Sequence, residues 1–170
     1  MVFKNKKGSL QDVIFIAVNL LLVAIVVLIV FKISNSFNDE IQTSTTIDKY
    51  GGATDARNAM GTMNSHFSGA LDNSFLFLVI GLAVVTIGLA VAVRIHPVFF
   101  IFFLIGLIVI IFVCGVMSNI YQEMAEQPEL AAEAAQLVFI TNIMRFLPFI
   151  IGTLGFIISI ILYNNWSSNR

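Results

Sequence analysis

Four long apolar runs divide the chain, and polar segments separate them. The runs lie at about residues 13–33, 75–93, 98–117 and 142–163. Each run is close to the roughly 20 apolar residues that a helix needs to cross a hydrocarbon core about 30 Å thick. The pattern predicts an all-α, polytopic integral membrane protein with four transmembrane helices, organised as a single membrane domain over residues 1–170.

The second and third runs give the clearest signal. Only the four residues 94–97 separate them. A linker this short joins two spanning helices as an antiparallel hairpin, and Pro97 suits the first turn of the helix that follows because that turn needs no amide donor. Asp72, Asn73 or Ser74 is expected to cap the amino-terminal end of the second spanning helix.

The polar segments 34–74 and 118–141 are expected to hold interfacial helices on the outer side. A structureless connection of about 40 residues would be unusual in a compact protein. Residues 53–68 are predicted to form a short helix lying on the membrane or on a partner. Its apolar positions recur at helical spacing: Ala56, Ala59, Met60, Met63 and Phe67.

Pro128 is expected to start a further, alanine-rich helix over residues 128–138. The fourth spanning helix is predicted over residues 142–163, with Pro148 as a kink.

Small and polar residues inside the runs predict where helices pack. Gly81 and Gly88 lie seven residues apart on nearly one helical face, and Gly152 and Gly155 form a second small-residue face. Such faces let helix backbones approach closely, within the chain or between copies, so self-association is expected. Asn19 is the mid-membrane polar residue of the first run and is expected to bond a neighbouring helix.

Charge is distributed asymmetrically although the net charge is only -1. Five of the nine Lys and Arg residues fall in the short segments around the two ends and the 94–97 turn, which favours both termini inside. This inner basic face comprises Lys4, Lys6, Lys7, Arg94 and Arg170. Contact with anionic lipid or with nucleic acid would be a possible addition to its orienting role.

The outer side carries nine of the ten acidic residues. Four glutamates that follow the third run are predicted to contact an outer partner: Glu123, Glu126, Glu129 and Glu133.

Little in the sequence suggests catalysis. No Asp or Glu lies within a predicted span, which disfavours a proton-coupled or cation-coupled transporter. His66 and His96 are expected on opposite sides of the membrane, and Cys114 has no second cysteine to pair with. We therefore expect neither an enzyme nor a metal or organic cofactor.

Three stretches carry a resemblance to a known group of proteins: residues 73–78 (NSFLFL), 94–100 (RIHPVFF) and 118–123 (SNIYQE). Together they resemble small four-span membrane proteins of tailless icosahedral viruses with an internal lipid membrane. The resemblance covers roughly the last 100 residues. It implies a structural protein of the virion membrane whose outer segments meet a capsid shell and whose basic side faces the genome.

Two other functions remain open from the residues alone. One is a holin-like pore or lysis protein that assembles through its glycine faces. The other is an accessory subunit that stabilises partners in a cellular membrane complex. Long polar loops and the lack of a polar stripe along any span count against the pore.

Overall fold

The computed structural model describes residues 10–49, 52–92 and 97–167, and side chains within these ranges except at 10–13, 92, 97–99, 165 and 166. The described elements are helical throughout, which confirms the predicted all-α class. In chain order they are α1 (Leu10–Thr43), the 3-10 turn η1 (Ile47–Lys49), α2 (Ala53–Ala92), α3 (Pro97–Ala125), α4 (Ala131–Gln136), α5 (Val138–Arg145) and α6 (Leu147–Ser167).

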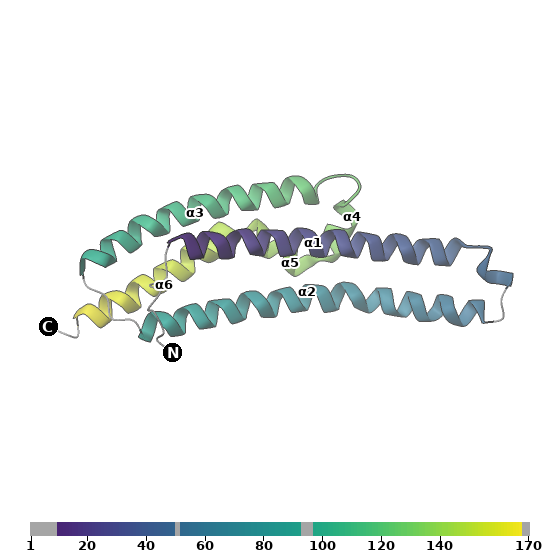
Figure 1. Cartoon of the computed structure of the whole chain (residues 1–170), viewed down its shortest axis with the longest axis horizontal. Coiled ribbons are helices and arrows are strands. Elements are labelled where there is room, and N and C mark those ends of the chain that lie inside the picture. The colour runs from purple at the N-terminus through teal and green to yellow at the C-terminus, as the bar shows by residue number, and fades with distance from the viewer. Residues whose placement is uncertain (1–9, 50–51, 93–96, 168–170) are drawn as a thin grey trace, which may run out of the picture.

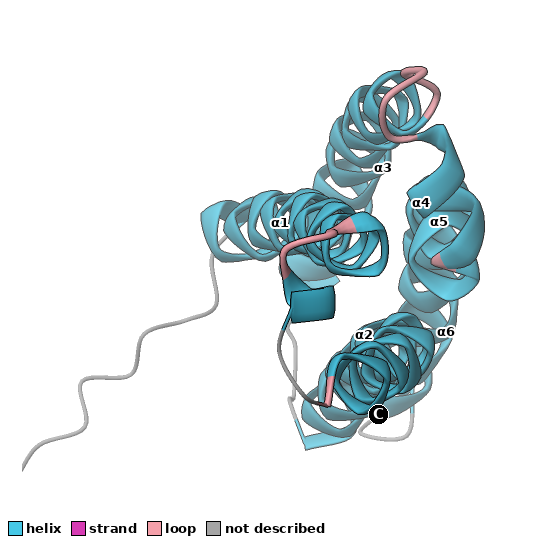
Figure 2. Cartoon of the chain, turned by 90° about the vertical axis from the view of Figure 1, so that its right-hand side faces the viewer, coloured by secondary structure: helices cyan, strands magenta, loops and turns pink. Residues whose placement is uncertain are grey.

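Four of these helices are long and apolar enough to cross a membrane: α1, α2, α3 and α6. They form a bundle in which α1 begins at the same end as α6 finishes (Figure 1). Viewed along the bundle, α1 packs against α2 and α3, and the α5–α6 segment closes the other side (Figure 2). The protein is thus a polytopic helical membrane protein with an up-and-down arrangement of spans.

The predicted hairpin of α2 and α3 is only partly correct. The two helices run in opposite directions, as a short linker requires, but they do not pack side by side (Figures 1 and 2). Each packs instead against α1 on one side and against the α5–α6 segment on the other. The linker itself lies outside the described residues.

α1 is the central helix of the bundle. One third of its most apolar window is buried, against 11% for α2 and for α3. Apart from Leu20, its buried positions recur at spacings of four and three residues: Ala17, Leu21, Ala24, Leu28 and Phe31. This is the heptad spacing of a helix seam, and the two alanines leave space for close approach of neighbouring helices.

α2 is a single helix of 40 residues, which differs from two of the sequence predictions. Residues 53–68 continue the spanning helix and do not lie across its end as a separate helix. Asp72 therefore sits in the interior of α2 and cannot cap its start. The helix begins after Gly52, whose φ of +93° is a conformation that glycine adopts without strain, and the Ala56 amide bonds the Gly52 carbonyl at 3.0 Å.

The fourth spanning helix also begins later than predicted. Residues 142–145 belong to the short helix α5, and the helical path breaks at Phe146 before α6 starts at Leu147. Pro148 lies in the first turn of α6, where a missing amide costs no hydrogen bond, so it starts a helix and does not kink one. The alanine-rich helix is likewise shorter than predicted, with α4 spanning six residues.

Candidate functional site: a polar collar and a projecting hairpin

A layer of polar contacts joins the helices where the apolar spans end, and we call it the polar collar. It consists of Lys32 in α1, Asp72 in α2, Ser118 and Tyr121 in α3, Glu133 in α4, and Thr141 in α5. These side chains fasten α4 and α5 onto the long helices. The collar lies at the end of the bundle opposite the start of α1, which we call the hairpin end (Figure 1).

Asp72 makes the most specific contact of the collar. Its two carboxylate oxygens accept hydrogen bonds from the backbone amides of Phe139 and Ile140, at 2.8 and 2.7 Å. These amides belong to the first turn of α5, where no earlier carbonyl is available to them. Leu137, at the N-cap position of α5, offers no side-chain acceptor. Asp72, which is 6% exposed, thus caps α5 from another helix.

Lys32 joins α1 to α4. Its ammonium donates to Glu133 Oε1 at 3.2 Å, and the Glu133 side chain is almost fully buried. The second oxygen, Glu133 Oε2, is buried and has no hydrogen-bond partner among the residues that the structure describes. A buried carboxylate depends on its counter-ion, so this contact ties the position of α4 to that of α1.

Hydroxyl groups complete the collar on the α3 side. The Tyr121 and Thr141 hydroxyls lie 3.3 Å apart, and the Thr141 hydroxyl also donates to the Ala134 carbonyl at 2.9 Å. The Ser118 hydroxyl donates to the Arg145 carbonyl at 2.9 Å. These bonds satisfy carbonyls near the α4–α5 junction and at the end of α5.

The collar residues lie at a consistent depth in the three spans that contribute them, and α6 has the same length. Counting 1.5 Å per residue, α1 from Leu10 to Lys32, α2 from Asp72 to Ala92 and α3 from Pro97 to Ser118 each measure about 30–33 Å. α6, from Leu147 to Ser167, measures about 30 Å. This is the thickness of a hydrocarbon core, so the polar collar coincides with one face of the membrane-spanning layer.

Beyond the collar, α1 and α2 continue side by side as a projecting hairpin, which comprises residues 34–49 and 52–71 (Figure 1). On the α2 side it reaches about 28 Å past Asp72. Polar side chains join the two helices near its base: Ser34 donates to Asn64 at 2.9 Å, and Asn64 donates to Asn35 at 2.8 Å. Phe31 and Phe67 pack below them, with ring centroids 6.5 Å apart.

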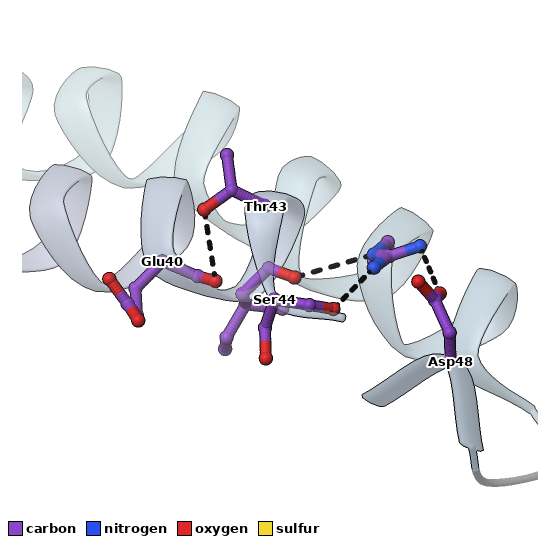
Figure 3. A network of polar contacts seen from close by, with 6 residues as sticks. Glu40, Thr43, Ser44 and Asp48 are labelled. Atoms are coloured by element: carbon purple, nitrogen blue, oxygen red, sulfur yellow. Dashed lines mark hydrogen bonds and ion pairs between the residues drawn. The ribbon is translucent and has the colours of Figure 1, made fainter. Parts of the chain in front are cut away.

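Arg57 fixes the tip of the projecting hairpin. Its guanidinium donates to the carbonyls of Ile41 and Ser44, at 3.3 and 2.7 Å, and pairs with Asp48 at 2.7 Å (Figure 3). The two carbonyls belong to the end of α1, where backbone acceptors lack helical partners and where a positive charge is favourable. Gln42 returns a bond to the Arg57 carbonyl at 3.0 Å.

The two predicted glycine faces have different surroundings. A methyl group added at Gly155 would clash with the Leu107 side chain, and one at Gly152 would contact Ile111 at 3.6 Å. This face packs α6 against α3 within the chain. A methyl group added at Gly81 or Gly88 would have no other side chain or helix of the described residues within 4 Å, and both positions are exposed. Packing of another helix on them would therefore have to come from a second molecule.

Asn19 does not bond a neighbouring helix among the described residues. Its side-chain amide donates to the Phe15 carbonyl of its own helix at 2.7 Å, and the side chain is exposed. The sequence prediction for this residue is therefore wrong within the chain. Bonding back to the preceding turn gives the amide a local partner on an apolar surface.

The four glutamates that were predicted to contact an outer partner differ in their exposure. Glu123, Glu126 and Glu129 are exposed at the hairpin end and stay available to a partner. Glu133 is buried in its contact with Lys32, so its predicted role as an outer contact is wrong. The residues of the predicted inner basic face, at 4, 6, 7, 94 and 170, lie outside the described residues.

Sequence reasoning missed the polar collar. Its members are single polar residues scattered over five helices, and nothing in their spacing links them. The buried seam of α1 left no signal either, because the residues on the other faces of this helix are equally apolar. Searches against protein-family models, curated proteins and solved structures found no match for this chain.

Proposed function

We propose that this chain is a structural membrane protein of a larger assembly, and that its projecting hairpin links the bilayer to a protein shell. The observation that carries the proposal is the hairpin itself. Residues 53–71 form a straight extension of a spanning helix, held to α1 by side-chain bonds from its base to its tip. Two helices joined by hydrogen bonds are stiffer than an unstructured loop of the same length. They therefore hold a bound partner at a more fixed distance from the membrane.

The surface of the hairpin end supports binding to a protein. Phe37 and Met63 are more than half exposed on the hairpin although both lie beyond the collar, outside the apolar layer. Acidic side chains are exposed on the same hairpin at Asp39, Glu40 and Asp55, and at the hairpin end at Glu123 and Glu129, whereas Asp48 pairs with Arg57 and Lys49 is an exposed cation. A surface with exposed apolar groups and mostly acidic exposed charges fits a partner surface with apolar pockets and basic rims.

The proposed orientation places both termini inside and the hairpin outside. It rests on the density of Lys and Arg near the ends of the chain. In the most specific form of the proposal, the membrane is the internal membrane of a virion and the shell is its capsid. The basic inner segments would then face the genome, and exposed Gly81 and Gly88 would serve contacts between copies.

A photo-cross-linking experiment tests this proposal. A benzophenone amino acid at Phe37 is irradiated in intact particles, and a second variant carries it at Phe112, which is also exposed but lies within the apolar span. We expect an adduct with the major shell protein from position 37 and none from position 112. Absence of the chain from purified particles, or equal adducts from both positions, would contradict the proposal.

A further inference from the structure

A hollow of about 330 Å³ lies at the hairpin end between α3, α4 and α5. Its lining includes four alanines, whose small side chains leave the space open: Ala125, Ala131, Ala134 and Ala135. The polar part of the lining comes from Tyr121, Gln122, Glu126, Thr141 and Arg145. The hollow therefore has a mostly apolar lining with five polar or charged side chains, and it lies at the depth of the membrane surface.

Two opposite charges at this hollow lack ionic partners. Arg145 and Glu126 are exposed, and neither makes an ion pair with another residue that the structure describes. The hydroxyls of Tyr121 and Thr141 already bond each other. The Gln122 amide donates to the Ser118 hydroxyl at 3.1 Å. The charged groups open to a ligand are a guanidinium, which suits a phosphate, and a carboxylate, which suits an ammonium.

A second, apolar groove of about 420 Å³ lies within the span between α3 and α6. It is lined by Ile111, Pro148, Phe149, Gly152, Thr153 and Phe156. The Thr153 hydroxyl bonds the Phe149 carbonyl, so the groove offers no unsatisfied polar group of that residue. The end of the groove nearest the polar collar is at Pro148, which is three residues from Arg145 in the sequence.

The hollow and the groove lie on one side of α3. Ile111 lines the groove and Gln122 lines the hollow, and the step of eleven positions from one to the other makes about three helical turns, which returns the chain to the same face. The separation along the helix is about 16 Å. This is close to half the thickness of a hydrocarbon core, the depth that one acyl chain occupies.

We propose that the hollow and the groove together bind one phospholipid whose headgroup carries a primary amine, as in phosphatidylethanolamine. The phosphate pairs with Arg145, the ammonium donates to Glu126, and an acyl chain lies along the groove beside Gly152. A lipid with a glycerol headgroup brings no cation for Glu126. A choline headgroup brings a cation that has no N–H to donate. This inference does not depend on the proposed function.

Native mass spectrometry of the detergent-purified full chain tests the proposal. The protein is equilibrated with equal amounts of phosphatidylethanolamine, phosphatidylcholine and phosphatidylglycerol of the same acyl chains, and the retained lipid is counted. We expect ethanolamine lipid to be retained about fivefold over the other two, the scale of an exposed charge pair. Glu126→Gln should abolish this preference, and Arg145→Gln should lower retention of all three lipids.

Glu129→Gln is the matched control, because Glu129 is exposed near the hollow but does not line it. Ala135→Leu, which fills the hollow without changing charge, should reduce retention of ethanolamine lipid as Glu126→Gln does. Equal retention of the three lipids by the natural chain would overturn the proposal, as would the same loss in Glu129→Gln. Displacement of the lipid by an equal concentration of soluble phosphoethanolamine would overturn the role of the groove.

Discussion

The carboxylate of Asp72 accepts a hydrogen bond from the backbone amide of Ile140 at 2.7 Å, although 68 residues separate the two along the chain. This contact gives the first turn of α5 the acceptor that its own N-cap residue lacks. It also fixes α5 against α2 at the depth where the spans end. The short helices of the hairpin end therefore owe their position to side chains of the long ones.

Replacing Asp72 with Ala should destabilise the protein by about 1–2 kcal/mol, the usual cost of losing a helix cap. The buried amide of Ile140 and the part-buried amide of Phe139 would then lack an acceptor. Asp72→Asn keeps one acceptor oxygen, so its stability should lie between that of the natural chain and that of Asp72→Ala. The measurement is thermal unfolding in detergent, with Asn73→Ala as the control, since Asn73 is the exposed neighbour of Asp72. Equal melting of both alanine variants would show that the cap contributes nothing.

The Lys32–Glu133 contact predicts an order among three variants. Lys32→Met leaves the buried Glu133 carboxylate without its counter-ion and should cost more than about 1 kcal/mol. Glu133→Gln leaves the partly exposed Lys32 free to reach solvent and should cost less. The double variant Lys32→Met with Glu133→Leu should recover stability, because it removes both charges. Thermal unfolding gives the order, and additive losses would rule out coupling between the two residues.

The sequence was sufficient for the class of fold and insufficient for the contacts between its helices. Apolar runs of about 20 residues predict four spans because the bilayer sets their length. The ends of the spans were harder to predict: α2 runs through Asp72 without a break because no Pro interrupts residues 53–92.

The candidate site was predicted least well, for a related physical reason. The same residue type occurs at lipid-facing and at packed positions, so the sequence does not separate Gly88 from Gly155. It likewise does not separate the exposed Glu129 from the buried Glu133, which are both glutamates of one acidic segment. Whether each of these residues is packed or exposed depends on its neighbours in three dimensions. Leu107 covers Gly155, and Lys32 covers Glu133.

The two glycine faces predict opposite responses to a large side chain. Gly155→Leu should lower stability by about 1–3 kcal/mol, because Leu107 occupies the space that the new side chain needs. Gly88→Leu should leave the stability of a single molecule unchanged, since nothing lies within 4 Å of that position. Thermal unfolding in excess detergent, where copies are separated, distinguishes the two. Similar losses in both variants would contradict the packing described here.

Arg57→Lys should loosen the tip of the projecting hairpin. One ammonium cannot replace the three guanidinium contacts to Ile41, Ser44 and Asp48. The amides of Lys49 and Ala56, which are bonded near the tip, should exchange with deuterium roughly tenfold faster. Asp39→Asn, which changes an exposed charge on the same hairpin, is the control and should exchange at the natural rate. Unchanged exchange in Arg57→Lys would show that the tip does not depend on this residue.

The central claim is that α2 crosses the lipid up to the polar collar and then continues into water. Spin labels placed one at a time along α2, in a Cys114→Ala background in lipid vesicles, test this claim through their accessibility to oxygen and to a water-soluble nickel complex. We predict that oxygen dominates at positions such as Phe77, that nickel dominates at positions such as Met63, and that the change occurs near residues 72–75. Oxygen accessibility that rises and falls every three to four residues across 53–68 would instead place this segment flat on the bilayer and contradict the account.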